Sequence, residues 1–255
     1  GDHRDLHSFP TRRSSDLWGY GPALSRWLAR FNGLVPLLTT VCIALFVISV
    51  VLDLLTNARH QPLSSVWAPG LESLYRLGIT GRYAFSQGRW WTLITAVYLH
   101  GGILHILFNI LWLRQLGYLL EELFGASRTF IIFTLAGIAG FVVSVTMGSM
   151  FTLGGSGAIF GMLGALIYYG RRRGGYFGAA IFRQVGSWAI MAFIFGFLFP
   201  NIDNWAHFGG FIGGYLSAML LGYREIRAEK AVDRYAALLL LVLTVFAFIM
   251  VAVTF

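Results

Sequence analysis

The sequence has little charge for its length of 255 residues. Only 12% of the residues are Asp, Glu, Lys or Arg, whereas about a quarter is typical of a soluble domain. Hydrophobic residues make up 57% of the chain, and the mean hydropathy is +0.69. This composition excludes an ordinary soluble domain and indicates a protein that lies mostly within a membrane.

Cysteine is almost absent as well. Cys42 is the only one in the sequence, so no disulfide can form within the chain. Residues 1–17 have neither an initiator Met nor the apolar run of a signal peptide. We expect them to be a non-native leader or a disordered segment rather than part of the folded protein.

The chain has instead a series of long hydrophobic runs. A run of roughly 20 apolar residues is long enough to cross a bilayer as a helix. Such runs cover residues 34–55, 102–120, 130–150, 155–170, 184–200, 204–223 and 235–255. We therefore predict an all-α polytopic membrane protein. It would comprise a six-helix bundle over 34–223, a basic linker over 224–234 and a seventh transmembrane helix over 235–255.

The basic residues predict an orientation rather than a nucleic-acid partner. The net charge is +8, but most of the 19 Lys and Arg residues fall in the terminal segment and in alternate loops. The segments between those loops contain only Arg59, Arg76, Arg82 and Arg89. Because basic residues favour the cytoplasmic side, we predict a cytoplasmic N-terminus and an outer C-terminus. Residues 18–33 mix Trp and Arg with apolar residues, and we expect them to lie at the cytoplasmic interface.

Polar residues gather at the outer ends of three predicted spans. A charge at mid-helix costs about 2.5–3.5 kcal/mol in a membrane, so polar residues there are candidate functional residues. They are His100, His105 and Asn109 at the second span, Ser156 at the fourth and His207 at the sixth. His105 and Asn109 are four residues apart and share a helix face. The three ends face the same side in the predicted topology, so we expect these residues at one depth.

A serine at a helix N-terminus beside a histidine is a candidate nucleophile with its general base. Glycines permit close helix packing, so the fourth and sixth spans can approach until Ser156 reaches His207. The Ser156 N–H, His105 and Asn109 are then candidates to stabilise an oxyanion. Asp203 lies in the outer loop four residues before His207, so a dyad is a simpler interpretation than a triad. The glycines are Gly157, Gly161, Gly164, Gly210 and Gly214.

Other interpretations of these residues remain open from the pattern alone. Ser156 and its glycines could serve only in helix packing, and the bundle could then be a membrane chaperone or binding protein. A small transporter could use His105 and His207 as a proton path. A metal site built from His100, His105 and His207 would lack an HExxH helix and any accompanying carboxylate or thiol. We therefore expect no metal site.

Three motifs together resemble the rhomboid intramembrane serine proteases. They are His100–x4–His105–x3–Asn109, Gly154–x–Ser156–Gly157 and Ala206–His207–x2–Gly210–x3–Gly214, in this order along the chain. The resemblance covers roughly residues 70–223. It implies a six-helix bundle with a catalytic dyad reached by water from the outer side, and the seventh span resembles the six-plus-one arrangement of part of the family.

The resemblance also implies a role for each matching residue. Ser156 would be the nucleophile and His207 the general base, while His105, Asn109 and the Ser156 N–H would form the oxyanion hole. His100 would have a supporting role. Where some members have a tyrosine, this chain has Phe160, which we expect to stack on His207 and position it.

The same resemblance implies the reaction and its setting. The expected function is an intramembrane serine endopeptidase without a cofactor, in a bacterial-type inner membrane. The expected partners are the lipid bilayer and single-pass membrane proteins, cut near the outer membrane boundary. The sequence leaves open the oligomeric state, and the gating route remains open between the fifth span and the outer loop.

Overall fold

The computed structural model describes residues 33–57, 67–199 and 202–254. The predicted leader 1–17 and all but the last residue of the predicted interfacial segment 18–33 lie outside these ranges. The described residues are helical throughout, apart from short turns and one isolated bridge between Thr80 and Thr152. The long helices are α2 (Leu34–Asn57), α7 (Ile103–Phe124), α8 (Ala126–Thr146), α9 (Ser156–Arg173), α10 (Gly175–Leu198), α11 (Asn204–Leu221) and α12 (Ala231–Val253).

Five of these helices, α2, α7, α8, α10 and α12, are long and apolar enough to cross a membrane. The other two, α9 and α11, are shorter, with 18 residues each. Every predicted span corresponds to one long helix in the described part of the chain, although several boundaries differ. The prediction of an all-α polytopic membrane protein is confirmed.

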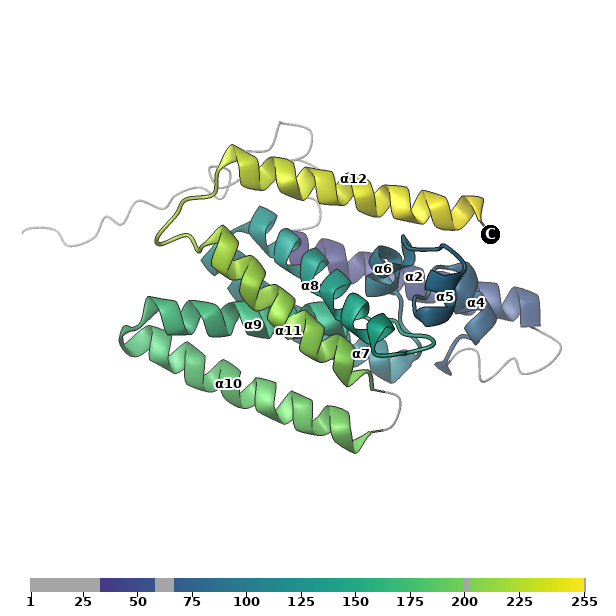
Figure 1. Ribbon diagram of the computed structural model, residues 1–255, viewed down its shortest axis with the longest axis horizontal. Coiled ribbons are helices and arrows are strands. Elements are labelled where there is room, and N and C mark those ends of the chain that lie inside the picture. The colour runs from purple at the N-terminus through teal and green to yellow at the C-terminus, as the bar shows by residue number, and fades with distance from the viewer. Residues whose placement is uncertain (1–32, 58–66, 200–201, 255) are drawn as a thin grey trace, which may run out of the picture.

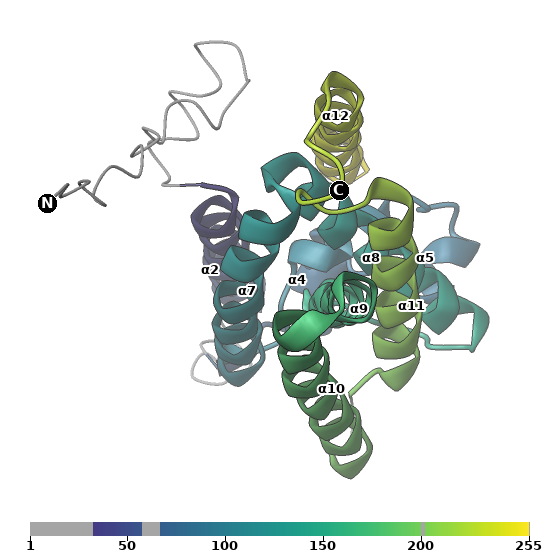
Figure 2. The ribbon, with the colours of Figure 1, turned by 90° about the vertical axis from the view of Figure 1, so that its left-hand side faces the viewer.

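Helix α9 lies in the middle of the molecule (Figure 2), with α7, α8, α10 and α11 around it. Most of its residues from Gly157 to Leu166 are buried. Helix α12 runs along one edge of the bundle, beside α8 (Figure 1). The core therefore forms around the helix that carries the candidate nucleophile.

Glycines bring α9 and α11 close together, as the sequence predicts. A Cβ atom added at Gly210 would lie 2.1 Å from the carbonyl oxygen of Gly157, and one at Gly214 would lie 2.0 Å from that of Gly161. Real atoms do not approach backbone so closely, so only glycine fits at these crossings. Because side chains are absent there, the two backbones pack directly against each other.

Three helices begin earlier than predicted because charged residues lie inside them. Helix α10 begins at Gly175 instead of 184 and includes Arg183. Helix α8 begins at Ala126 instead of 130 and includes Arg128, while α12 begins at Ala231 instead of 235 and includes Asp233. Arg128 is fully buried, and its Nη2 lies 2.8 Å from Oδ2 of Asp233. Arg128 also donates to the carbonyl groups of Gly222, Arg227 and Ala228. Its position in the sequence suggested an ordinary charge in a cytoplasmic loop. In the structure, Arg128 instead links α8 to α12 through its ion pair with Asp233.

Replacing Asp233 with alanine is expected to lower the stability markedly. The change leaves the Arg128 guanidinium buried without its carboxylate, and breaking a buried pair in this way costs about 3–5 kcal/mol. Thermal unfolding in detergent measures the effect. The matched control is Glu72→Ala, which removes an exposed pair at 2.6 Å from Arg76 and should cost about 1 kcal/mol or less. Equal midpoints for the two variants would contradict the anchoring role of Asp233.

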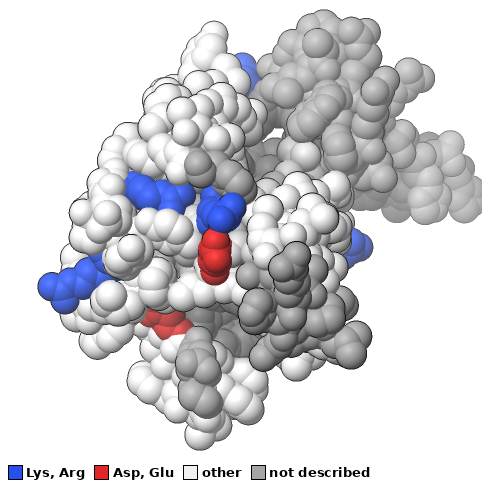
Figure 3. Space-filling view, turned by 90° about the vertical axis from the view of Figure 1, so that its right-hand side faces the viewer, with Lys and Arg blue, Asp and Glu red and all other residues white. Residues whose placement is uncertain are grey.

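Short helices between α2 and α7 form a compact segment. They are α4 (Leu71–Arg76), α5 (Arg82–Ser86), α6 (Thr92–Thr95) and the 3-10 turn η2 (Ala96–Tyr98). Buried Arg89, for which the sequence suggested no defined role, donates to the carbonyl of Tyr75 at 2.9 Å and lies over its ring. Figure 3 views the molecule from this end and shows only a few scattered charged groups among the described residues. The segment leads directly to the candidate site, because the Ala96 carbonyl accepts a hydrogen bond from the Gly154 N–H.

Candidate active site

The first turns of α9 and α11 bring Ser156 and His207 together. Ser156 is the first residue of α9, and His207 lies in the first turn of α11. The Ser156 Oγ and the His207 Nε2 are 2.9 Å apart, within hydrogen-bond distance. His207 is buried, whereas Ser156 is partly accessible. Two residues 51 positions apart in the sequence are thus brought within hydrogen-bond distance of each other.

Phe160 stacks on one face of the His207 ring. The two rings stack at 4.1 Å between centroids, with an angle of 12° between their planes. Phe160 lies one helical turn after Ser156 on the same helix, so a single helix supplies both the serine and the stacking ring. The stack expected from the sequence is present.

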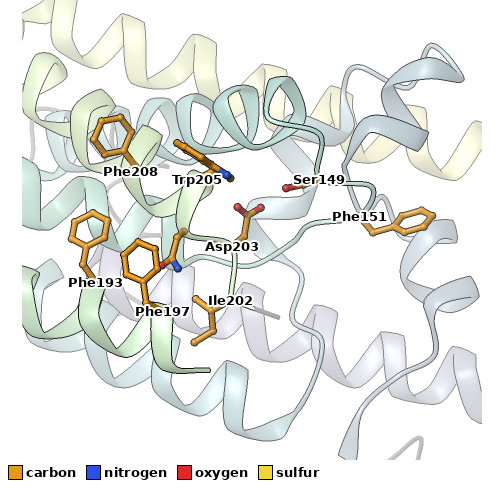
Figure 4. Close-up of a pocket in the computed structure, with 9 residues that line it drawn as sticks. Ser149, Phe151, Phe193, Phe197, Ile202, Asp203, Trp205 and Phe208 are labelled. Atoms are coloured by element: carbon orange, nitrogen blue, oxygen red, sulfur yellow. The ribbon is translucent and has the colours of Figure 1, made fainter. Parts of the chain in front are cut away.

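Asp203 does not contact the histidine ring. Its Oδ1 accepts from the Ala206 N–H at 3.0 Å and caps α11, and its Oδ2 accepts from the Ser144 hydroxyl of α8. Figure 4 shows its carboxylate directed towards Ser149. Nδ1 of His207 is buried and has no hydrogen-bond partner among the described residues. The ring of His207 therefore contacts the Ser156 hydroxyl through Nε2 and Phe160 through one face.

His105 and Asn109 line the same cavity from α7. The Gly101 N–H donates to Nδ1 of His105 at 3.4 Å, which leaves Nε2 as the protonated nitrogen of a neutral ring. Asn109 donates through Nδ2 to the His105 carbonyl at 2.8 Å. Its amide nitrogen has a second hydrogen that remains available. Both side chains can therefore donate towards the space beside Ser156.

His100 is the most buried of the predicted site residues, with 1% of its surface exposed. It lies between η2 and α7, and its ring is 5.2 Å from the ring of His105 at an angle of 66°. It does not line the cavity that contains Ser156 and His207. His100 thus stands behind the site rather than in it.

A cavity of about 790 Å³ opens over the serine and the histidine. Its walls come from α7, α9, α10 and α11, and most of the lining is apolar. Exposed residues of α7 and α10, such as Phe108 and Phe195, belong to the lining. The cavity therefore reaches the surface between these two helices. A second cavity of about 740 Å³ lies between the end of α10 and the start of α11 (Figure 4) and does not include the serine or the histidine.

No group of three His, Cys, Asp or Glu residues in the described part of the chain is arranged to hold a metal ion. His100, His105 and His207 do not converge as a ligand set, since the Nε2 of His207 contacts Ser156 and His100 lies outside the cavity.

A sequence model of the Rhomboid domain matches residues 87–224, which is more than half of the chain and includes all six candidate site residues. The chain belongs to the rhomboid family. The match begins just after α5, extends through α11 and ends before α12. Helices α2, α4, α5 and α12 of this rhomboid therefore lie outside the family match.

Named relatives of this rhomboid include bacterial and plant proteins. Rhomboid protease GluP of Bacillus subtilis is 39% identical over 155 residues, or 59% of this chain and 30% of the relative. RHOMBOID-like protein 5 of Arabidopsis thaliana is 31% identical over 66% of this chain and 57% of the relative. RHOMBOID-like protein 1 of the same plant is 30% identical over 73% of this chain and 52% of the relative. The chain thus spans between 30% and 57% of the length of these relatives.

Sequence reasoning missed the tryptophan pair that forms part of the cavity wall. Trp112 of α7 and Trp188 of α10 meet edge to face at 5.7 Å, and both line the cavity. The only hint of this contact in the sequence was that each of the two hydrophobic runs contains a tryptophan. A tryptophan in a membrane helix more often marks the interface, so only the packing of α7 near α10 identifies this contact.

Replacing Phe160 with leucine should slow catalysis in this rhomboid without unfolding it. Leucine keeps much of the apolar volume but removes the ring stack, which is worth about 0.5–1.5 kcal/mol and corresponds to a severalfold to tenfold lower kcat. Phe160→Tyr keeps the ring and serves as the control. Cleavage of a membrane substrate under saturating conditions measures the effect. Equal kcat values for Phe160→Leu and the parent would exclude a positioning role.

Proposed function

We propose that this rhomboid is an intramembrane serine endopeptidase with a Ser156–His207 dyad. It cleaves transmembrane segments of single-pass membrane proteins near the outer membrane boundary. The observation that carries the proposal is the 2.9 Å contact between the Ser156 Oγ and the His207 Nε2 at the base of an apolar cavity. The names of relatives such as Rhomboid protease GluP support the same reaction class.

In the first half of the reaction, the Ser156 Oγ attacks the carbonyl carbon of the scissile peptide. Nε2 of His207 takes the hydroxyl proton as the new C–O bond forms. The imidazolium then gives this proton to the leaving nitrogen, and the C–N bond breaks. The products of this half are an ester on Ser156 and a released amine. The Phe160 ring keeps the imidazole plane fixed while its charge changes.

The developing oxyanion needs donors on the side of Ser156 that faces α7. The Ser156 N–H lies at the start of a helix, where the N–H groups have no partner within the helix and the helix dipole favours negative charge. Nε2 of His105 and the second Nδ2 hydrogen of Asn109 are the side-chain donors on α7. Such fixed donors act strongly in a site that excludes bulk water.

In the second half, a water molecule attacks the ester carbonyl, and Nε2 of His207 removes its proton. The Ser156 Oγ leaves and recovers a proton from the imidazolium, which restores the free enzyme. No redox or metal chemistry enters these steps, and no cofactor is needed. Each half breaks one bond to the carbonyl carbon and forms one.

The cavity supports a membrane-borne substrate. Its wall between α7 and α10 is built from exposed apolar side chains, including Phe108, Met191 and Phe195. A transmembrane segment could therefore enter sideways without leaving the hydrocarbon region. The cytoplasmic N-terminus in this proposal rests on the charge distribution. The bacterial inner membrane and the outer cleavage position rest on the resemblance to the family.

Reconstitution with a defined substrate tests the proposal. The purified protein is mixed in lipid vesicles with a single-span protein that has small residues near its outer boundary, and the products are identified by mass spectrometry. We expect one cut close to that boundary. Cleavage only within a soluble domain, or no cleavage at all, would overturn the proposed specificity or activity respectively.

A further inference from the structure

Gly155, which directly precedes the nucleophile, has a backbone conformation that does not require glycine. Its φ of −72° and ψ of −6° lie in the right-handed region, which any residue adopts. A Cβ atom built there would have no close clash: its three nearest neighbours are at 3.5, 3.6 and 3.9 Å. Neither backbone strain nor crowding therefore explains the glycine, in contrast to Gly210.

The three neighbours of that position are all polar atoms. They are the carbonyl oxygen of Val97 at 3.5 Å, Oδ1 of Asn109 at 3.6 Å and Nε2 of His100 at 3.9 Å. They come from η2, from α7 and from the turn between them. Each of these three parts of the chain thus places a polar atom within 3.9 Å of the position of that Cβ.

Two of these atoms have no hydrogen-bond partner among the described residues. Oδ1 of Asn109 and Nε2 of His100 are both buried and unpaired, and their residues are only 7% and 1% exposed. A buried polar group without a partner costs about 1–3 kcal/mol. Buried polar groups of this kind are commonly satisfied by ordered water with two to four partners.

We propose that the space beside Gly155 is a binding site for one ordered water molecule. The water donates to Oδ1 of Asn109 and to the Val97 carbonyl, and it accepts from the protonated Nε2 of His100. This assignment satisfies both unpaired atoms and uses each hydrogen of the water once. Glycine is present because a side chain at this position would occupy the space of the water.

The water gives His100 a positioning role in the proposed reaction. It fixes Oδ1 of Asn109 from behind the site, and this holds the amide so that its Nδ2 points to the His105 carbonyl and to the oxyanion. His100 thus acts on catalysis through the water and Asn109, although it does not line the cavity. The inference rests on the proposed function, because the oxyanion exists only during peptide cleavage.

Two substitutions at Gly155 test the site. Gly155→Ala fits the backbone and the space but displaces the water with a methyl group, so we expect kcat to fall about tenfold to a hundredfold with little change in KM. Gly155→Ser adds a hydroxyl that can replace the water, and it should recover most of the lost kcat. The matched control is Gly186→Ala in α10, where a Cβ meets only Ile167 at 3.7 Å and kcat should stay at the parent value.

The outcomes separate this inference from the proposed function. Parent cleavage together with unchanged kcat in Gly155→Ala overturns the water site and leaves the protease intact. Equal losses in the Ala and Ser variants also overturn it, because the effect would then be steric. An inactive parent overturns the proposed function itself. If Gly155→Ala does not fold, a crystal structure of the parent that shows ordered water decides: density within hydrogen-bond distance of the three atoms supports the site, and its absence refutes it.

Discussion

Ser156→Ala is expected to abolish peptide cleavage, with a loss of at least about 10³-fold in kcat. The substitution removes the serine Oγ, which lies 2.9 Å from Nε2 of the proposed base His207. It leaves helix α9 intact because alanine is a good helix former. Cleavage of a single-span substrate, followed on gels and by mass spectrometry, measures the loss. A fluorophosphonate probe should label the parent at Ser156 and leave the variant unlabelled.

The matched control for this experiment is Ser187→Ala. Ser187 is an exposed serine of α10 whose hydroxyl bonds only to the Gln184 carbonyl of its own helix. The variant should cleave the substrate and react with the probe as the parent does. Comparing two serine substitutions in one protein separates the loss of the nucleophile from the general effect of removing a hydroxyl in a membrane helix.

The same experiment distinguishes the other interpretations of the bundle. A membrane chaperone or binding protein would retain substrate capture in Ser156→Ala, and its parent would neither cleave nor react with the probe. A transporter with a histidine proton path would depend on His207 but only weakly on Ser156. Residual cleavage by Ser156→Ala at the parent rate would show that another residue is the nucleophile.

Gly210→Ala should cause the second large effect, the loss of both activity and stability. The added Cβ would lie 2.1 Å from the carbonyl oxygen of Gly157 and 2.7 Å from its carbonyl carbon. Backbone cannot move aside as a flexible side chain can, so α11 must separate from α9. Overpacking of this kind costs about 1–3 kcal/mol or more. Separation near Ser156 and His207 also breaks the 2.9 Å contact.

Two readouts are needed to interpret Gly210→Ala. Thermal unfolding in detergent should show a lower midpoint, and probe labelling at a temperature where the variant is still folded should show a less reactive Ser156. Gly186→Ala is again the control, since its Cβ would make only an ordinary contact. A Gly210→Ala variant with parental stability and labelling would mean that the close crossing of α9 and α11 is not required.

The long helices were predictable because the length of a hydrophobic run can be read directly from the sequence. Boundaries were wrong where charged residues lie inside a helix, as with Arg128 in α8 and Asp233 in α12. Sequence rules place such residues at the membrane surface, since an isolated buried charge is costly. The cost of burying a charge falls when it is paired with an opposite charge. Arg128 and Asp233 form such a pair although they are 105 residues apart in the sequence.

The identity of the candidate site residues was also predictable, because spacing and order specify which polar residues share a helix end. The hydrogen-bond and ring-contact partners of these residues were not predictable from the sequence. Asp203 lies one turn before His207 in sequence, yet its carboxylate caps α11 and accepts from Ser144. The ring that does contact His207 belongs to Phe160 on another helix.

The sequence by itself determined the class of the protein, its membrane helices and the polar residues that gather at three helix ends. These follow from composition, run length and spacing, which depend only on neighbouring residues. The tertiary structure decided how close α9 and α11 approach, which pair of charges is buried, and which polar atoms face the space beside Gly155. Such features depend on contacts between distant segments, and their distances arise only when the helices pack around α9.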